Sequence, residues 1–296
     1  MFVRESTASS VTVDTPAKVN LFLQILQRRP DGYHDINSLF QAVTLFDTLN
    51  FSVTASDGVT IRLQPGIELP VDASNLITKA YHLIRERFRL SRGLQVVLRK
   101  MIPVSAGLGG GSADAAAVIL ACNQLFDLGL SCREMARLGL NIGSDIPFFF
   151  AGGQALVSGR GEVIRESTYP TDYQMLLVTP ALAIATTDSY SALKRDLTTS
   201  KLPFSLACCR TVDDLVASLR LAGNDFEEVQ FRSYPVLGEI RDELLRCGAL
   251  LTRMSGSGPT MFGIFGSETR IVEDKILSRG DWRVHPVKPV SLSGRT

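Results

Sequence analysis

Residues 107–112 read Gly-Leu-Gly-Gly-Gly-Ser and run directly into the alanine-rich segment 113–117. Glycine lacks a Cβ and tolerates positive φ, so successive backbone amides here can curl around an anion. We expect the glycines to exclude a helix and the alanines to begin one, whose first turn adds free amides and a positive dipole end. The pattern predicts a phosphate-binding loop before a buried helix. A flexible loop or a tight helix–strand contact is the alternative.

Three common nucleotide-binding motifs do not fit this stretch. A P-loop needs a Gly-Lys pair, and the chain contains none. The Rossmann fingerprint G-x-G-x-x-G fails because its third glycine would be Ser112. The His-Arg-Asp and Asp-Phe-Gly motifs of protein kinases are absent as well. We therefore predict an anion-binding loop of another class, in which Ser112 can cap the helix, contact a phosphate or ligate a metal.

Composition argues against several other classes of protein. The 31 basic and 30 acidic residues give a net charge of +1, which offers no electrostatic case for nucleic acid or a membrane surface as the main partner. Five cysteines without a C-x-x-C pair, and only three histidines, argue against a disulfide framework and a zinc site. With no signal-peptide pattern and no apolar run of membrane-spanning length, we expect a reduced, soluble, cytoplasmic protein.

Periodicity predicts an α+β protein with two domains, 1–165 and 166–296, which a length of 296 residues also favours. Asn75 is a candidate N-cap for the helix that follows it. The expected strands are 11–14, 19–26, 42–53, 59–63, 94–98, 175–178, 250–253, 260–265 and 282–285. The expected helices are 76–88, 113–125, 189–195, 212–220, 234–246 and 268–278.

Three segments resemble, in order, the motifs of the GHMP kinases, a family named after galacto-, homoserine, mevalonate and phosphomevalonate kinases. Residues 16–23 resemble the first motif, 103–116 the second and 253–260 the third. Three coincident motifs are far more specific than any one of them. The resemblance spans nearly the whole chain. It implies a ribosomal-protein-S5-like N-terminal domain, a ferredoxin-like C-terminal domain and an active site in the cleft between them.

Residues 16–21, 29–34 and 143–149 resemble more closely the branch of the family that phosphorylates the 2-hydroxyl of 4-diphosphocytidyl-2-C-methyl-D-erythritol, in the non-mevalonate route to isoprenoids. The resemblance implies a small-molecule kinase with ATP as phosphoryl donor and a cytidine-diphosphate-linked sugar alcohol as acceptor. We infer Mg²⁺ from ATP chemistry, because no carboxylate cluster indicates a metal site and Ser112 is a possible ligand. A monomer or a homodimer is expected.

Lys18 and Asp145 are the catalytic pair that the resemblance implies. Asp145 would orient the acceptor hydroxyl or take its proton, and Lys18 would keep that carboxylate ionised and offset charge on the transferred group. Whether Asp145 removes a full proton stays open, because a loose transition state does not require strong base catalysis. From the residues alone, Asp145 could equally cap a turn before Pro147, and Lys18 could be a solvent-facing strand residue.

The resemblance also implies an acceptor pocket that contains Asn20, Tyr33 and His34. Tyr33 would stack on the cytosine ring and His34 would hydrogen-bond its edge. Without the resemblance, this pair is more simply a strand that follows a turn. Tyr190 is a candidate second aromatic wall, and Thr186 is a candidate polar contact.

The implied ATP and phosphate contacts lie mainly in the second motif. They are Asn75, Lys100, Pro103, Gly107, Leu108, Gly109, Gly110, Gly111, Ser112 and Ala113. Residues Ser255, Gly256, Ser257 and Gly258 are expected to form a second phosphate turn, a hairpin between two strands, or both. For Asn75, a role as the N-cap of the helix 76–88 explains the residue as well as a contact with ATP does. Pro259 stands where the family usually has alanine and lacks an N–H, so we assign no amide contact there.

Two other functions compete with this interpretation. Another GHMP kinase acceptor, such as mevalonate or homoserine, is the first, and the Tyr33–His34 pair argues against it. A non-catalytic nucleotide-binding or regulatory protein on the same scaffold is the second. Retention of both Lys18 and Asp145 argues against a pure binder, which needs neither. An unrelated phosphate-binding module would have to match three motifs by chance.

Overall fold

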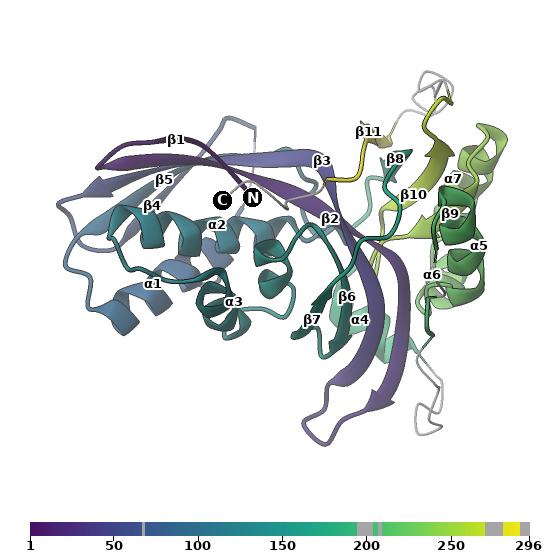
Figure 1. The fold of residues 1–296 in the computed structure, drawn as a ribbon, viewed down its shortest axis with the longest axis horizontal. Helices are drawn as coiled ribbons and strands as arrows, with labels where there is room; N and C mark the ends of the chain where they lie inside the picture. Colours follow the sequence, from purple (N-terminus) through teal and green to yellow (C-terminus); the bar gives the residue numbers. More distant parts are fainter. Residues whose placement is uncertain (67–68, 194–203, 207–208, 270–280, 291–296) are drawn as a thin grey trace.

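The computed structural model describes residues 1–66, 69–193, 204–206, 209–269 and 281–290, and contains two β-sheets set beside each other (Figure 1). The strands of the larger sheet are β1 Phe2–Ser6, β2 Ser10–Arg28, β3 His34–Thr54, β4 Val59–Leu63, β5 Gly93–Arg99, β6 Gln154–Gly159 and β7 Val163–Glu166. Those of the smaller sheet are β8 Tyr173–Thr179, β9 Leu251–Met254, β10 Met261–Gly266 and β11 Arg283–Val287. The helices are α1 Leu76–Phe88, α2 Gly110–Leu125, α3 Cys132–Leu140, the 3₁₀ helix η1 Ile146–Phe150, α4 Thr186–Ala192, α5 Val212–Ala222, α6 Glu227–Ser233 and α7 Pro235–Arg246.

A long antiparallel ribbon, β2 with β3, runs through the larger sheet (Figure 1). Its two ends join different neighbours, since β3 pairs with β5 over 48–54 and with β6 over 36–41. The expected separate strands 11–14 and 19–26 are one strand, β2, which corrects the sequence prediction. A register shift between Pro16 and Ala17 marks a bulge, which lets the strand continue past a proline that lacks a ladder donor.

Helices α1, α2 and α3 lie together against one side of the larger sheet (Figure 1). Strands β4 and β5 pair in parallel, and α1 supplies the crossover that such a pair needs. Asn75 caps α1 as predicted, because its side chain accepts a hydrogen bond from the amide of Ile77. The buried face of α2 is built from small residues, which lets it pack closely against β2, α1 and η1.

The start of α2 differs from the prediction. The helix begins at Gly110, and Gly109 is its N-cap with φ 69°, so two of the glycines are helical and Ser112 does not cap the helix. Close packing is the physical reason. A Cβ on Gly110 would lie 2.9 Å from side-chain atoms of both Ile102 and Lys100, so position 110 favours glycine. The loss of helix propensity is offset by burial.

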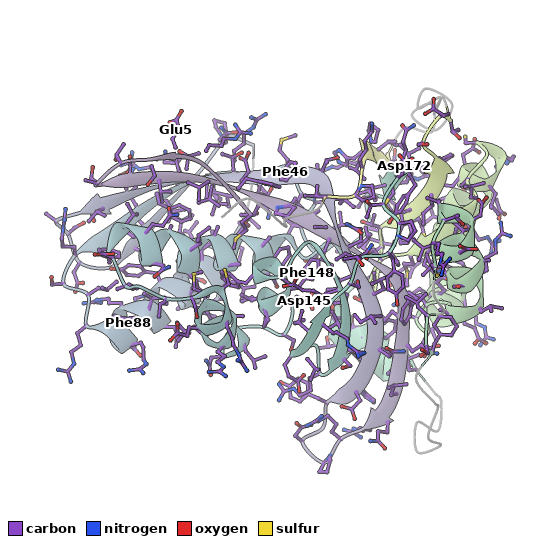
Figure 2. All side chains as sticks on the ribbon, in the orientation of Figure 1. Glu5, Phe46, Phe88, Asp145, Phe148 and Asp172 are labelled. Carbon is purple, nitrogen blue, oxygen red and sulfur yellow. The ribbon has the colours of Figure 1, made fainter. Side chains whose placement is uncertain are left out.

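The smaller sheet has the order β11-β8-β10-β9, in chain order fourth, first, third and second, and every pairing is antiparallel. This is the arrangement of a ferredoxin-like sheet. Helix α7 packs on β9 and β10, whereas α5 packs against β2. The larger sheet ends at Glu166 and the smaller begins at Tyr173, with Asp172 in the link (Figure 2). Division of the chain near residue 165 stays a prediction.

Several elements were not expected from the sequence, namely β1, β6, β7, α3 and α6. The short strands β6 and β7 lack strict alternation. The expected helix 234–246 is present as α7, but α6 precedes it directly. The expected helices 268–278 and, in part, 189–195 fall on residues outside the described ranges. Of the helices described, none has the length and apolar character needed to span a bilayer.

Gly139 of α3 offers a test of how η1, which follows Asp145, is held. A Cβ on Gly139 would lie 2.3 Å from Cγ2 of Ile146, so Gly139→Ala should force the two elements apart and destabilise the protein by about 1–3 kcal/mol. Gly238→Ala in α7 is the matched control, since no atom lies within 4 Å of its Cβ, and it should stabilise by about 0.5–1 kcal/mol. Urea unfolding measures both. Equal stabilities for the two variants would contradict this packing.

Candidate active site

A cavity of about 740 Å³ opens between the larger sheet, the glycine-rich loop and the elements that lead into the smaller sheet. Most of the residues predicted from sequence line it together. These are Lys18, Asn20, Tyr33, Asn75, Lys100, Pro103, Gly107, Leu108, Gly109, Gly110, Gly111, Ser112, Asp145, Thr186, Tyr190, Gly256 and Ser257. Four predicted residues lie behind this lining: His34, Ala113, Ser255 and Gly258.

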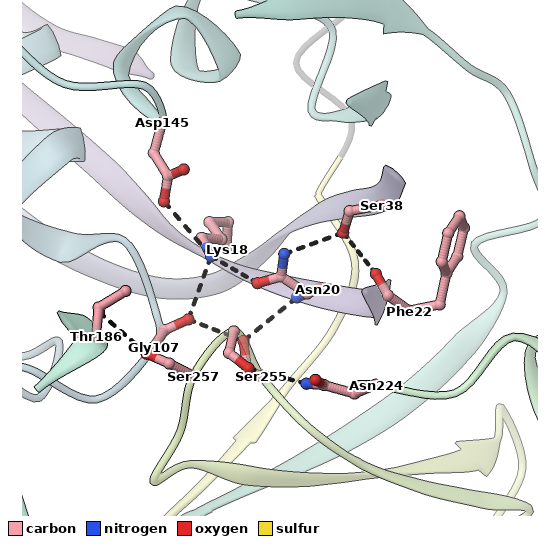
Figure 3. A network of polar contacts seen from close by, with 11 residues as sticks. Lys18, Asn20, Phe22, Ser38, Gly107, Asp145, Thr186, Asn224, Ser255 and Ser257 are labelled. Carbon is pink, nitrogen blue, oxygen red and sulfur yellow. Dashed lines mark hydrogen bonds and ion pairs between the residues drawn. The ribbon is translucent and has the colours of Figure 1, made fainter. Parts of the chain in front are cut away.

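Lys18 and Asp145 face each other across the cavity wall (Figure 3). The Nζ of Lys18 lies 3.6 Å from Oδ2 of Asp145, and it donates to Oδ1 of Asn20 at 2.6 Å and to the carbonyl of Gly107 at 3.3 Å. Lys18 is 4% exposed, whereas one third of the Asp145 side chain remains open. The lysine is therefore held in a fixed position, and the carboxylate next to it stays accessible to a ligand.

Asn20 links this pair to two further segments (Figure 3). Its side chain donates to Oγ of Ser38 on β3, and its backbone amide donates to Oγ of Ser255. Ser255 in turn donates to the carbonyl of Gly107 at 2.9 Å. Because Ser255 is fully buried, its hydroxyl fastens the third-motif loop to the glycine-rich loop instead of facing the cavity.

The glycine-rich loop approaches its neighbours too closely to carry side chains. Gly107 and Gly109 have φ of 76° and 69°, a region that favours glycine. A Cβ on Gly107 would lie 2.2 Å from the carbonyl oxygen of Ser255, and one on Gly109 would lie 2.9 Å from Cγ of Lys18. The loop thus places the N-terminus of α2 beside Lys18, which is the arrangement of an anion site at a helix N-terminus.

Lys100 lies at the edge of the cavity, but its charge is engaged by protein groups. Its Nζ donates to Oδ2 of Asp114 at 2.7 Å and also to Asp47. Asp47 is fully buried and also accepts the backbone amides of Met101 and Ile102. Sequence reasoning missed both carboxylates, because Asp47 sits in an apolar strand and Asp114 in an alanine-rich helix. Lys100 as a phosphate contact stays a prediction.

Asp114 is the less satisfied of the two carboxylates. It is 3% exposed, and its Oδ1 has no hydrogen-bond partner among the described residues. Burial is the largest influence on it and, although Lys100 opposes the effect, raises the pKa of Asp114 to about 7. One of the two carboxylates beside Lys100 can therefore hold a proton near neutral pH.

Aromatic and basic side chains gather at the acceptor end of the predicted site. Tyr33 is 54% exposed, and the guanidinium of Arg160 lies 3.7 Å from its ring centroid. His34 stacks on Tyr190 with centroids 5.1 Å apart. Burial, with a smaller effect of Asp145, raises the pKa of Tyr190 to about 12, and burial lowers that of His34. Sequence reasoning missed Arg160, because only the fold brings the β6–β7 turn to Tyr33.

Thr186 and Asn75 mark two other parts of the wall. The hydroxyl of Thr186 at the start of α4 lies 3.1 Å from that of Ser257 in the third-motif loop, so these two predicted residues are in contact. Asn75 is the N-cap of α1 and also lines the cavity, so the cap is confirmed and a contact with ATP stays a prediction. The strands β9 and β10 flank residues 255–258 as an antiparallel hairpin, as expected.

Comparison with known families and proteins agrees with this geometry. The family model for the N-terminal domain of GHMP kinases matches residues 75–153, and the model for their C-terminal domain matches residues 207–279. The chain belongs to the GHMP kinases. This family consists of small-molecule kinases, so the cavity is the candidate active site of a phosphotransferase.

Among curated GHMP kinases, the chain is similar to two 4-diphosphocytidyl-2-C-methyl-D-erythritol kinases. It is 42% identical to that of Heliobacterium modesticaldum over 270 residues, 86% of this chain and 85% of the relative. It is 38% identical to that of Syntrophotalea carbinolica, over 93% of this chain and 98% of the relative.

Solved structures agree with this comparison. A crystal structure of 4-(cytidine 5'-diphospho)-2C-methyl-D-erythritol kinase has a TM-score of 0.74 and 30% identity, covering 94% of this chain and 99% of that one. A homoserine kinase from Cytophaga hutchinsonii has a TM-score of 0.73 at 19% identity, covering 98% of both chains, and shows the shared fold alone.

A dedicated metal cage is absent from the described residues of this GHMP kinase, where no three His, Cys, Asp or Glu side chains cluster closely enough to hold an ion. The cavity does offer the half-buried hydroxyl of Ser112, in the first turn of α2 beside the glycine-rich loop. Magnesium bound to a nucleotide takes most of its ligands from phosphates and water, and few from protein. The residues present fit such an ion.

The raised pKa of Asp114 makes stability depend on pH. Between 3.8 and about 7 the folded protein holds a proton on Asp114 that the unfolded chain has released, so stability from this group is full at low pH and lost as pH rises through 7. We expect the free energy of unfolding of the wild type, relative to Asp114→Asn, to fall from pH 5 to pH 8. Urea titrations at several pH values measure it.

Asp214 supplies the control for this titration. Backbone amides lower its pKa, so its protonation takes place below pH 5 and Asp214→Asn should differ from wild type by the same amount at pH 5 and pH 8. A difference between wild type and Asp114→Asn that does not change with pH would show that Asp114 is ionised throughout.

Proposed function

We propose that this protein transfers the γ-phosphoryl group of ATP to the 2-hydroxyl of 4-diphosphocytidyl-2-C-methyl-D-erythritol. The contact between Lys18 and Asp145 at the N-terminus of α2 is the observation that carries the proposal, because it joins an accessible carboxylate to a phosphate-binding loop. Curated relatives with this activity, up to 42% identical over most of the chain, support the choice of acceptor.

Asp145 would act on the acceptor hydroxyl. Its carboxylate is partly open to the cavity, so an alcohol can donate a hydrogen bond to it and be oriented toward the γ-phosphorus. The proton leaves the hydroxyl as the oxygen–phosphorus bond forms, and Asp145 would either accept it or mainly orient the hydroxyl. Two phenylalanines of η1, which follows Asp145 directly, are buried.

Lys18 would serve the transferred group. Its ammonium is fixed by Asn20 and Gly107, so little reorganisation is needed when negative charge develops on the phosphoryl oxygens. The amides of the glycine-rich loop and of the first turn of α2 would hold the phosphates of ATP. Magnesium held by those phosphates, with the hydroxyl of Ser112 as a protein ligand, would neutralise part of their charge.

The acceptor would lie toward the tip of the β2–β3 ribbon. Tyr33 offers an exposed ring for the cytosine, while the stacked pair of His34 and Tyr190 forms the wall behind. Thr186 and Asn20 would supply polar contacts to the sugar alcohol. A cytoplasmic location and a monomeric or homodimeric state are parts of the same proposal.

The proposal is tested with a coupled assay of ADP release. The purified protein is given ATP, Mg²⁺ and one alcohol at a time: 4-diphosphocytidyl-2-C-methyl-D-erythritol, mevalonate or homoserine. We expect rapid turnover of the first alone. Turnover of mevalonate or homoserine, with no turnover of the cytidyl compound, would contradict the proposed acceptor and show that the protein phosphorylates another substrate of the family. ATP binding without turnover of any alcohol would favour a non-catalytic protein.

Asp145→Asn should lower kcat by about 100-fold or more, because the amide cannot accept the proton and orients the hydroxyl poorly. Binding of ATP should be nearly unchanged. Steady-state kinetics and calorimetric titration with ATP measure the two effects. Asp172→Asn removes a charge from the exposed link between the sheets and serves as control. A kcat near the wild-type value in Asp145→Asn would remove Asp145 from the catalytic role.

Tyr33→Ala should raise the KM for the cytidyl acceptor about tenfold or more, since stacking of a base on an aromatic ring contributes about 1–3 kcal/mol. Tyr33→Phe keeps the ring and should remain close to wild type. The KM for ATP should not change in either variant. Equal KM values for the acceptor in Tyr33→Ala and wild type would place the cytosine elsewhere.

A further inference from the structure

Asn224, which sequence reasoning did not single out, lies between α5 and α6 and is 6% exposed. Both the amino group and the carbonyl group of its side chain form hydrogen bonds. The Nδ2 donates to the carbonyls of Met254 at 2.8 Å and Gly256 at 2.9 Å, while Oδ1 accepts from the amide of Phe226 at 2.9 Å. Two donors and one acceptor on one planar group are what an asparagine supplies and an aspartate does not.

The segment around Asn224 is also attached to β2. The amide of Leu23 donates to the carbonyl of Gly223, and the carbonyl of Leu23 accepts from the amide of Asp225. The two segments run parallel at this bridge. The carboxylate of Asp225 accepts from the amide of Ile25 at 2.8 Å. Asn224 therefore ties the third-motif loop to the strand that carries Lys18 and Asn20.

Gly256, whose carbonyl accepts from Asn224, lies beside both groups that fix Lys18. Its φ is 58°, and a Cβ built on it would lie 3.4 Å from Oδ1 of Asn20 and 3.4 Å from the carbonyl oxygen of Gly107. Those two oxygens are the acceptors of the Lys18 ammonium. Figure 3 shows Asp145 and Asn224 at opposite ends of the network, with Lys18, Asn20 and Ser255 between them.

We propose that Asn224 is a positioning residue of the phosphoryl-transfer site. It holds Gly256 against Asn20 and Gly107, and so keeps Lys18 at its distance from Asp145 and from the phosphate loop. The inference rests on the proposed function in one respect, that phosphoryl transfer takes place at Lys18. It does not depend on which alcohol is the acceptor.

Asn224→Asp is the sharpest variant, because it keeps the shape and places a carboxylate oxygen against two carbonyl oxygens. We expect the rate of a single turnover to fall about 100-fold, the loss that a displacement of about 1 Å in a catalytic group produces. The Kd for ATP should stay within about threefold, since the amides of α2 are untouched. The rate is measured by rapid quench with whichever alcohol of the panel the wild type phosphorylates fastest.

Asn123→Asp is the matched control. Asn123 lies near the end of α2 and makes the same kind of contact with the loop that follows. Its Nδ2 donates to the carbonyl of Leu130, its Oδ1 accepts from the amide of Leu130, and it does not line the cavity. A purely structural role for Asn224 predicts that both variants lose Tm and keep their turnover rate per folded molecule. The positioning role predicts loss of rate in Asn224→Asp alone.

Asp225 provides a second route if Asn224→Asp does not fold. Asp225→Asn keeps an oxygen for the amide of Ile25 and should retain most of the turnover rate, whereas Asp225→Ala should lose it with little change in the Kd for ATP. The amide of Ser255 donates to the carbonyl of Thr260, and the amide of Gly258 donates to the carbonyl of Ser255. Hydrogen exchange of these two amides reports on the loop directly and should be faster in Asn224→Asp and Asp225→Ala.

Two results would overturn the inference. One is unchanged exchange at these amides in Asn224→Asp, or in Asp225→Ala if the first does not fold. The other is a wild-type turnover rate per folded molecule in that variant. Failure of the proposed function looks different, because the wild type itself would then phosphorylate another alcohol or none, while the exchange measurement would still decide the role of Asn224.

Discussion

The buried ammonium of Lys18 is the group on which the rest of the site depends. A cation that is almost fully removed from water must be surrounded by oxygen atoms, or its desolvation would not be offset. The fold supplies three oxygen groups: the side-chain carbonyl of Asn20, the backbone carbonyl of Gly107 and the carboxylate of Asp145. Asn20 lies on the same strand as Lys18, two residues further along. Each of the three groups comes from a different local structure. The strand, the glycine-rich loop and the turn before η1 are therefore fixed relative to one another by a single charge.

The same requirement explains the glycines. The loop must bring a backbone carbonyl to Lys18 and pass over the lysine stem, and side chains at 107 and 109 would collide with Ser255 and with Lys18 itself. The proposed anion binding and the support of Lys18 would thus be two uses of one loop geometry. A glycine-rich stretch of this kind is informative because both uses exclude every residue with a Cβ.

A second buried lysine, Lys100, is arranged in the opposite way. It is enclosed by Asp47 and Asp114, so its charge is balanced inside the protein. Lys18 faces a carboxylate that is open to the cavity and leaves room for a ligand. The two lysines therefore differ in that Lys100 is enclosed by carboxylates at the start of α2, whereas the one carboxylate beside Lys18 leaves space next to it.

Local chemistry was readable from the sequence. The cap at Asn75, the strand 59–63, the glycine-rich loop before a buried helix and the hairpin around 255–258 depend on neighbouring residues and were predicted. The helical state of Gly110, the continuity of β2 through Pro16 and the partners of Lys100 depend on contacts between distant segments. No pattern within a window of residues could supply them. Arg160 and Asn224 belong to the same class, since each acquires its partner only when two turns meet.

The two sides of the cavity, around Lys18 and around Tyr33, differ in how they are built. The groups around Lys18 and the glycine-rich loop lie where strands, helix α2 and buried polar contacts fix one another, so they cannot vary without disturbing the core. Tyr33, Arg160 and Thr186 lie in the β2–β3 turn, in the β6–β7 turn and at the start of α4, where side chains are at least partly exposed. Under the proposed function, substitutions there would change the surface offered to the acceptor while the segments around Lys18 keep their geometry. The side of the cavity proposed for the acceptor is therefore built mainly from turns, whereas the surroundings of Lys18 are built from segments that hold one another in place.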